Sequence, residues 1–526
     1  MLTFAAGVLD AEFEACIVGA GPAGLACALD LTQRGVRVLV LEAGGERPVP
    51  GDPDLLAAEI LHAEFHDPPA DGAASALGGR SHWWGGRSAP LDPGDFDAWP
   101  ISSADMQPWY ERAAAFIGAR AAHDTPAPGA FAHLVAFDAT RDETWGPQLN
   151  MRKRWRHALL GAEAPAVLLG ARVTGLERQA GAIAALRVRV GGEERRVRAK
   201  RFVLACGGLG CLKLLLLAQR DAPDLFGGAD GPLGRGYFGH LTGSIAELEF
   251  SDARDALAFS GRLLPGAVWA RRRIRPLAET ASAQGMTNIA FWLENAAGAD
   301  PSHGSAAGSA KYVAARAARA LAGRGHDRTP LRPHLKNIAN APVSAAASLA
   351  RAAHHLAVTR VTGRAPRPSL SVPAGRSRWR LDYHAEQKPD AANRVSLSPD
   401  RTDSIGAPAL RVDFRFSEAD AAAVQRAHDW LDRDLQAAGA GRLHMRAPAS
   451  DLNAMIRGAA RDGYHQLGGA SMHADPKRGV VDATCRVHGL DNLWIASGSV
   501  FASGGQANPT LTIVALALRT ADAVAR

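Results

Sequence analysis

Two polar side chains in the last part of the sequence, His465 and Asn508, each lie within a run of small residues. The runs read Tyr-His-Gln-Leu-Gly-Gly over 464–469 and Gly-Gly-Gln-Ala-Asn-Pro-Thr over 504–510. Glycine has no Cβ atom, so a large planar ligand can approach the backbone closely at such runs. A histidine titrates near neutral pH and can take up a proton, and an asparagine amide can donate a hydrogen bond to a developing negative charge. The two runs therefore predict proton-transfer chemistry against a flat ligand.

A nucleotide-binding pattern near the other end of the chain supplies such a ligand. An apolar run over 15–18 is followed by Gly-Ala-Gly-Pro-Ala-Gly over 19–24, a stretch with helical spacing, and a second apolar run over 36–41 that ends at Glu42. The glycines allow a tight turn, a close approach to a pyrophosphate and helix–strand packing, and the carboxylate can accept hydrogen bonds from ribose hydroxyls. The alternative is a glycine-rich turn in an unrelated α/β protein. The predicted contacts are Gly19, Gly21, Pro22, Ala23, Gly24 and Glu42.

A second strand-and-glycine segment over 198–208 favours FAD over NAD as the dinucleotide. Such a segment returns to the nucleotide sheet in many flavoproteins with a split cofactor domain, although alone it could be an ordinary strand–turn–helix. The strand around Val173 can lay its backbone against the adenine. Together the two ends of the chain suggest oxidation of an alcohol by hydride transfer to flavin.

The composition is that of a globular protein with a large core. The chain has 526 residues, 47% hydrophobic and 21% charged, which is enough for two domains. Its five cysteines form no CxxC pair and the sequence has no CxxCH, so no disulfide framework, metal site or c-type haem is predicted. The N-terminus shows no signal-peptide pattern and no apolar run is long enough to cross a bilayer, so a cytoplasmic protein is predicted.

The formal net charge of +7 is concentrated in one region. Residues 301–380 contain twelve Arg and two Lys but only one acid, Asp327. This region is either a docking face for an anionic substrate, an acidic redox partner or a membrane surface, or a solvated helical excursion. Aromatic residues do not alternate with the arginines, so a nucleic-acid partner is not predicted.

Five motifs in a fixed order resemble those of the glucose–methanol–choline (GMC) family of FAD-dependent oxidoreductases. The first is the glycine fingerprint, and the last runs from His465 through Asn-Leu-Trp-Ile-Ala-Ser-Gly-Ser over 492–499 to Asn-Pro-Thr over 508–510. The other three are Leu-Gly-Gly-Arg-Ser-His-Trp-Trp-Gly-Gly over 77–86, Leu-Gly-Arg-Gly-Tyr-Phe-Gly-His over 233–240, and Glu-Gln-Lys-Pro over 386–389 with Asn-Arg-Val-Ser-Leu over 393–397. The C-terminal motif looks most like the sugar- and polyol-oxidising branch, which includes pyranose oxidases and membrane-linked sugar dehydrogenases.

The resemblance implies an α/β plus α+β fold. A split Rossmann-type FAD-binding domain is expected over 1–95, 161–245 and 464–526, and a substrate-binding domain with an antiparallel sheet over 96–160 and 246–463. Residues 301–365 are expected to form a basic helical excursion from the second domain. The strands expected in the substrate domain are 244–250, 288–295, 378–384, 394–398 and 410–416.

The resemblance also implies that His465 and Asn508 are a catalytic pair beside flavin N5. The substrate would be a CH–OH group of a sugar, glycoside or polyol-like alcohol, and the imidazole would take its hydroxyl proton. Further cofactor contacts are expected at Gly79, Arg80, His82, Gly86, Val173, Gly498, Ser499, Pro509 and Thr510. For His82 two alternatives are open, a covalent bond to the flavin or a non-covalent position beside it, because Trp84 replaces a smaller polar residue of the covalent relatives. Tyr383 and Gln387 are predicted to contact substrate, and the neighbouring His384 is interpreted as a core residue.

Several rival functions share parts of this pattern. They are a flavin-dependent lyase of the same family, oxidation of a non-sugar secondary-metabolite alcohol, a non-catalytic FAD-bound scaffold, and an NADPH-using hydroxylase. The hydroxylase is disfavoured because no second GxGxxG lies between a strand pattern and a helical pattern, as a site for a nicotinamide dinucleotide requires. For the oxidation, an external acceptor is expected, which could be oxygen, a quinone or a redox protein, and the chain could form an oligomer.

Overall fold

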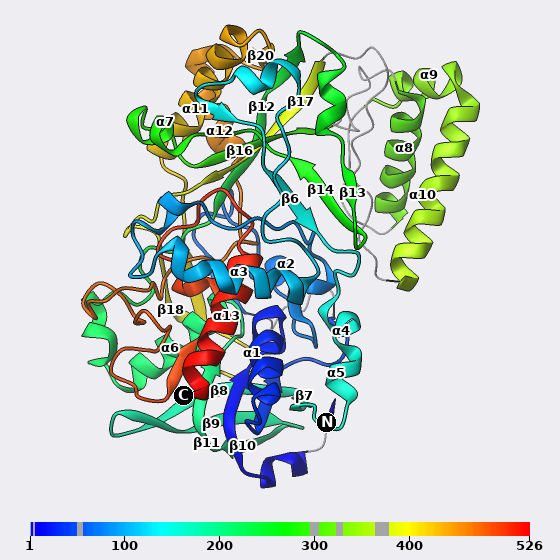
Figure 1. Ribbon diagram of the computed structural model, residues 1–526. Coiled ribbons are helices and arrows are strands. Elements are labelled where there is room, and N and C mark those ends of the chain that lie inside the picture. Colours follow the sequence, from blue (N-terminus) through cyan, green and yellow to red (C-terminus); the bar gives the residue numbers. More distant parts are fainter. Residues whose placement is uncertain (1, 4–5, 50–55, 295–304, 322–329, 363–377) are drawn as a thin grey trace.

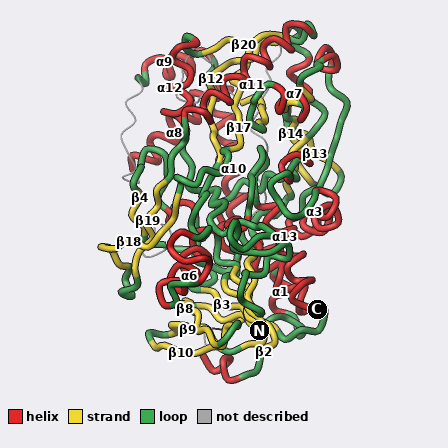
Figure 2. The backbone as a smooth tube through the Cα atoms, turned by 90° about the vertical axis from the view of Figure 1, so that its left-hand side faces the viewer, coloured by secondary structure: helices red, strands yellow, loops and turns green. Residues whose placement is uncertain are grey.

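The computed structural model describes residues 2–3, 6–49, 56–294, 305–321, 330–362 and 378–526. These residues form two tiers, a lower one built on a parallel sheet and an upper one built on an antiparallel sheet (Figure 1). Three helices, α8 to α10, stand beside the upper tier. The view turned by 90° shows the same two tiers, with loops filling much of the zone between them (Figure 2).

The lower tier contains a six-stranded sheet in the order β1-β7-β3-β2-β11-β21, in which every pairing is parallel. All five residues of β3 are buried, as expected for a parallel strand covered on both faces. Helices α1 and α13 pack on each other, and α13 also packs on α3. The predicted split Rossmann-type fold is confirmed. The strands are β1 (Leu2–Thr3), β2 (Phe13–Val18), β3 (Val38–Glu42), β7 (Ala166–Leu169), β11 (Ala199–Leu204) and β21 (Leu493–Ile495).

The upper tier contains an antiparallel sheet in the order β16-β17-β12-β20. Its strands are β12 (His240–Phe250), β16 (Ile289–Glu294), β17 (Arg378–Glu386) and β20 (Gly441–Met445). Side chains alternate along β17, so Trp379, Leu381 and Tyr383 share one face while His384 and Glu386 share the other. The apolar face packs toward helix α11 (Glu418–Ala437), whose His428 contacts the Tyr383 ring. Strand β12 crosses the predicted domain boundary at 245.

Two of the strands expected in the substrate domain belong to a different sheet. Strands β18 (Arg394–Thr402) and β19 (Pro408–Asp413) form a three-stranded sheet with β4 (Ala58–Ile60), which pairs with β19 in parallel. The remaining strands form three small sheets. They are β8 (Ala171–Gln179), β9 (Ala182–Val190) and β10 (Glu193–Val197); β6 (Asp142–Trp145), β13 (Arg262–Leu264) and β14 (Val268–Arg272); and β5 (Phe137–Asp138) and β15 (Arg275–Pro276).

The helices of both tiers surround these sheets. They are α1 (Pro22–Gln33), α2 (Pro69–Gly72), α3 (Ser103–Ile117), α4 (Met151–Arg154), α5 (Arg156–Leu160), α6 (Gly208–Asp221), α7 (Ala278–Ala283), α11, α12 (Ala449–Ala459) and α13 (Thr510–Ala525). Among the described helices, none combines the length and the apolar character that a membrane crossing requires. Cytoplasmic localisation stays a prediction.

The described part of the basic region is helical, as expected. It consists of α8 (Ala306–Leu321), α9 (Arg332–Asn340) and α10 (Pro342–Thr362), which pack on one another. The Tyr312 ring stacks on the buried His334 ring, with their centroids 4.4 Å apart. Asp327 and the arginines over 364–376 lie outside the described residues.

Burial of His428 predicts a specific loss of stability in acid. Its Nδ1–H donates to the Val424 carbonyl oxygen (2.8 Å), and burial lowers its pKa from 6.5 to about 4. The unfolded chain therefore binds a proton at His428 below about pH 6.5, while the folded chain binds it only below about pH 4. As the pH is lowered from 6.5 to 4, the folded state becomes less stable relative to the unfolded state. The free energy of unfolding in urea should therefore fall between about pH 7 and about pH 5 by about 2 kcal/mol less in His428→Asn than in the wild type. Parallel losses in both proteins would contradict the prediction.

Candidate functional site

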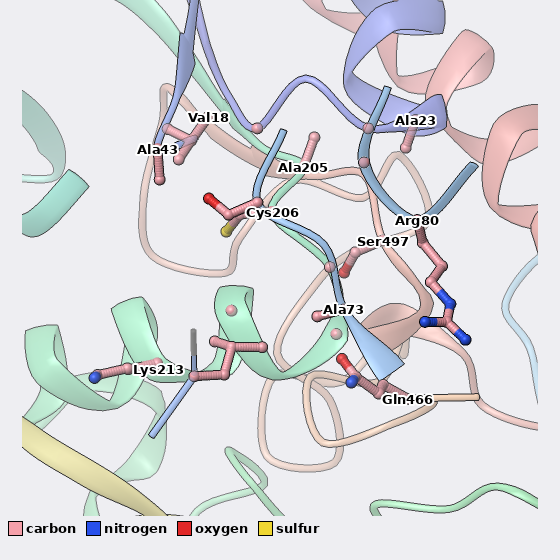
Figure 3. A pocket seen from close by; sticks show the side chains of 18 of the residues that line it. Val18, Ala23, Ala43, Ala73, Arg80, Ala205, Cys206, Lys213, Gln466 and Ser497 are labelled. Carbon is pink, nitrogen blue, oxygen red and sulfur yellow. The ribbon is translucent and has the colours of Figure 1, made fainter. Parts of the chain in front are cut away.

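A cavity of about 400 Å³ lies at the carboxyl ends of the parallel strands. Its lining includes residues at or just beyond the ends of β2, β3, β11 and β21, where α/β proteins bind their ligands. Figure 3 shows the lining with Val18 and Ala43 on one side, Ala23 and Arg80 on another, and Lys213 and Gln466 below. The cavity is thus built from both ends of the chain.

The glycine turn after β2 is shaped for close approach. Gly19 has φ +102°, and its N–H donates to the Leu41 carbonyl oxygen (2.8 Å). A Cβ atom at Gly19 would lie 2.7 Å from the Ala205 carbonyl oxygen, and one at Gly24 would collide with the Gly19 carbonyl. Gly21 caps the start of α1, so this helix N-terminus lies at the cavity. The turn fits the pyrophosphate of a dinucleotide.

Glu42 ends β3 at the cavity wall. One carboxylate oxygen accepts from Ala20 N–H and the other from Gly44 N–H, both at 2.9 Å. Burial raises the pKa of Glu42, and these hydrogen bonds together with one from Ser75 counteract that effect. The carboxylate is held rigidly where a ribose diol of the predicted dinucleotide would bind.

The predicted contacts Gly79 and Arg80 line the same cavity. Gly79 has φ +52°, and a Cβ atom there would lie 2.8 Å from Gly21 Cα, so the 77–86 motif packs directly on the glycine turn. The Arg80 guanidinium lies over the Tyr464 ring, 5.0 Å from its centroid. Gly86 has φ +68° and packs against Leu149 away from the cavity.

Both ring nitrogens of His82 are already engaged. Nε2 lies 3.0 Å from the Leu77 carbonyl oxygen, and Nδ1 lies 3.1 Å from the Asn150 amide nitrogen. His82 is half-buried and burial lowers its pKa. A covalent bond to a flavin would have to replace one of these hydrogen bonds.

Acid precipitation of the purified holoprotein tests whether the flavin is covalently bound to His82. Because both imidazole nitrogens have partners within the 77–150 segment, we expect the yellow cofactor to be released into the supernatant. Absorbance of the pellet and the supernatant is the measurement. Colour that stays with the pellet, and that is lost in His82→Ala, would instead establish the covalent alternative.

The opposite end of the cavity carries an ion-pair cluster. Lys213 Nζ lies 2.6 Å and Arg172 Nη2 lies 2.9 Å from Asp403 Oδ2, and all three residues line the cavity with Val173. Val173 lies where β8 becomes irregular in its pairing with β9. This cluster was not predicted, because its members come from three separate segments.

His465 lies at the cavity in a loop that Asp462 shapes. Asp462 Oδ1 accepts from the N–H groups of Gly463 (2.7 Å), Tyr464 (2.9 Å) and His465 (3.1 Å). Its Oδ2 accepts from the N–H of His240 (2.8 Å) and lies 3.2 Å from His465 Nδ1. Burial alone would raise the pKa of Asp462, but its interactions with His465 lower the pKa overall. One buried carboxylate therefore fixes both the loop and the imidazole.

Two further histidines, one of them interpreted from sequence as core, lie against His465. The His240 and His384 rings stack with centroids 4.2 Å apart, and the His465 ring meets them edge-on at 4.8 Å and 5.2 Å. Their backbone partners fix their tautomers. His240 Nε2 donates to the Gly505 carbonyl oxygen (3.1 Å), and His384 Nδ1 donates to the Gln506 carbonyl oxygen (2.8 Å).

Both rings are neutral at ordinary pH. Burial, assisted by the neighbouring His465, lowers the pKa of His240 to about 3. Burial and the two neighbouring histidines lower the pKa of His384 well below its usual value. His240 Nδ1 therefore presents a lone pair to His465 Nδ1, from which it is 3.2 Å away.

The remaining predicted residues of the C-terminal motif divide into two groups. Gly498, Pro509 and Thr510 line the cavity. Ser499 is buried, with its hydroxyl 2.6 Å from the Ser497 hydroxyl, and Asn508 is half-buried just before Pro509. Neither Ser499 nor Asn508 is among the described residues that line the cavity.

The side chains of Tyr383 and Gln387, which were predicted to contact substrate, are both engaged within the protein. Tyr383 is completely buried on the apolar face of β17. The Gln387 side chain accepts from Gly239 N–H (3.0 Å) and donates to the Arg415 carbonyl oxygen (2.7 Å). The structure brings neither to the described cavity lining, and it places His384 beside His465 instead, because side chains alternate along β17.

Models of known protein families match both the N-terminal and the C-terminal parts of the chain. The model for the C-terminal part of GMC oxidoreductases matches residues 389–517, and that for pyridine nucleotide-disulphide oxidoreductases matches residues 13–213. The chain is 25% identical to 6'''-hydroxyparomomycin C oxidase from Streptomyces lividus, over 99% of this chain and 92% of that protein. It is 26% identical to paromamine 6'-oxidase from Streptomyces fradiae, over 98% of this chain and 92% of that protein. These matches imply a flavin cofactor.

Solved structures share the fold over nearly the whole chain. Pyridoxine 4-oxidase from Mesorbium loti superimposes with a TM-score of 0.53 at 17% identity, covering 97% of this chain and 99% of that one. A fungal aryl-alcohol oxidase gives a TM-score of 0.54 at 14% identity, covering 98% and 99%. At these identities the likeness concerns the fold.

Proposed function

Because this chain belongs to the GMC oxidoreductase family, we propose that it oxidises a CH–OH group of a sugar, glycoside or polyol-like alcohol to the carbonyl, with His465 as the base. The observation that carries the proposal is an imidazole fixed by a buried carboxylate at the wall of the cavity that holds the dinucleotide fingerprint. The two relatives matched over nearly the full length, both oxidases of aminoglycosides, favour a sugar-like substrate.

The residues that would hold FAD are those of the fingerprint, the 77–86 motif and the C-terminal motif. Backbone N–H groups at the start of α1 would bind the pyrophosphate, and Glu42 would bind a ribose. Val173 and the cluster of Arg172, Lys213 and Asp403 would enclose the other end of the cofactor. Bound FAD would supply the hydride acceptor at N5.

The hydrogen bonds of His465 decide which nitrogen acts as the base. Asp462 Oδ2 and His240 Nδ1 can only accept, so His465 Nδ1 carries the proton. His465 Nε2 is then left with its lone pair and can take the hydroxyl proton of the substrate. Asp462 stabilises the imidazolium that forms, because it is a buried carboxylate 3.2 Å from Nδ1. Asn508 is half-buried next to Pro509, which lines the cavity, and from there it would donate a hydrogen bond to the developing alkoxide.

The electrons would then leave to an external acceptor, which could be oxygen, a quinone or a redox protein. Anaerobic bleaching of the flavin, measured against a panel of sugars, glycosides and aromatic alcohols, tests the proposal directly. We expect bleaching by one class of sugar-like alcohol. A flavin that no alcohol bleaches, in a preparation that cleaves cyanohydrins, would contradict oxidation and support the lyase alternative.

A further inference from the structure

The three histidines beside the cavity have the arrangement of a metal-binding site. One nitrogen each of His240, His384 and His465 lies within 4.8 Å of the other two. His240 is completely buried, His384 is 4% exposed, and His465 faces the cavity with 21% of its side chain exposed. An ion could therefore reach the cluster through the cavity and find ligands that are shielded from bulk water.

The backbone fixes the ligand atoms in the state that a metal needs. His240 uses Nε2–H and His384 uses Nδ1–H to donate to carbonyl oxygens of the 504–506 turn, so His240 Nδ1 and His384 Nε2 keep lone pairs. His384 Nε2 is buried without a hydrogen-bond partner among the described residues. Metal-binding histidines typically donate their second ring N–H to a backbone carbonyl or carboxylate in this way.

The distance between His240 and His465 suits a four-coordinate divalent ion, whereas the His384 ring, which stacks on His240 with an interplanar angle of 21°, has to tilt before its nitrogen faces the same ion. Two nitrogens bound tetrahedrally at the usual zinc–nitrogen distance lie about 3.3 Å apart. His240 Nδ1 and His465 Nδ1 are 3.2 Å apart. Asp462 Oδ2, 3.2 Å from His465 Nδ1, adds an anionic oxygen to the set. Three imidazoles and one carboxylate match the preferences of Zn²⁺.

We propose that His240, His384 and His465, with Asp462, form an inhibitory site for Zn²⁺. The ion binds His465 at Nδ1, and the proton of that nitrogen moves to Nε2. The imidazole then has no lone pair facing the cavity, so the ion and the proton transfer exclude each other. This last step depends on the proposed function, whereas binding of the ion does not.

Two matched variants test the site. His384→Asn keeps an amide donor where Nδ1 lies and removes Nε2, which should weaken Zn²⁺ binding at least ~10-fold. His428→Asn makes the same change at a completely buried histidine on the opposite face of β17 from the cluster; its Nδ1 also donates to a carbonyl, and its Nε2 also lacks a partner among the described residues. It should bind Zn²⁺ like the wild type.

The measurement is the metal content and Zn²⁺ affinity of the chelator-treated FAD holoprotein, titrated with Zn²⁺ alone. We expect one equivalent with three imidazole ligands at about 2.0–2.1 Å by X-ray absorption. Equal affinity in both variants, or no stoichiometric binding by the wild type, would overturn the proposal. A variant that retains FAD has folded. If His384→Asn does not fold, His240→Gln provides the second test of the metal site. Stoichiometric Zn²⁺ without loss of alcohol-dependent bleaching would refute the inhibitory role alone.

Discussion

Replacing His465 by alanine is expected to slow anaerobic reduction of the flavin by substrate about 10²- to 10⁴-fold. The imidazole is the group that the Asp462 carboxylate fixes at the cavity, and general-base catalysis by a positioned side chain contributes an acceleration of this size. FAD should stay bound, because the glycine turn and Glu42 do not depend on this ring. Stopped-flow absorbance of the flavin measures the rate, and the bound flavin spectrum measures occupancy.

Two companion variants make this expectation specific. Asp462→Asn keeps a side-chain oxygen for the loop but removes the charge that stabilises the imidazolium, so the rate should fall, but less than in His465→Ala. His157→Ala changes an exposed histidine on α5 and should leave the rate unchanged. Reduction of His465→Ala at the wild-type rate would show that another group removes the proton.

Gly24→Ala is expected to abolish FAD binding or folding of the parallel sheet. A Cβ atom at this position would collide with the Gly19 carbonyl oxygen, and the Ala205 side chain closes off another direction at 3.4 Å. Neither Gly19 nor Ala205 can shift without disturbing a hydrogen bond of the sheet, because the Gly19 N–H donates to the Leu41 carbonyl oxygen and the Ala205 N–H donates to the Val18 carbonyl oxygen. The collision would displace α1 from the turn that binds the pyrophosphate.

The flavin-to-protein absorbance ratio and the melting temperature measure this effect. Gly458→Ala is the matched control, since a methyl group there meets no atom within 4 Å and the residue lies inside α12. Alanine in a helix interior is favoured over glycine by about 1 kcal/mol, so this control should be as stable as the wild type or slightly more stable. Full FAD content in Gly24→Ala would contradict the prediction, because it would mean that the glycine turn can shift to accommodate the methyl group.

The cofactor half of the fold was predictable because its signals are local. Strand, glycine turn, helix, strand and Glu42 follow one another within a single stretch, and a Cβ atom at Gly19 or Gly24 would collide with the neighbouring backbone. The assignment of β18 and β19 was only partly right, because a strand pattern does not say which strand it pairs with. Their partner β4 lies in a distant segment.

The histidine cluster could not be predicted for a related reason. His240, His384 and Asp462 come from three separate segments that meet only when β12 pairs with β17 and the 462–465 loop closes on them. Alternation along β17 does place Tyr383 and His384 on opposite faces, but sequence alone does not tell which face is covered by α11. Tyr383 was therefore predicted for the substrate side, although it belongs to the core.

The order of strands in the parallel sheet has a consequence for biosynthesis. Strand β21 completes one edge next to β11, and α13 covers α1, yet both are translated long after their neighbours. The nascent chain therefore carries an open sheet edge and an uncovered helix while the whole upper tier is being made. We therefore expect the nascent chain to be prone to aggregation in this region until β21 and α13 have been synthesised, and chaperones that cover the open edge to raise the yield of folded protein.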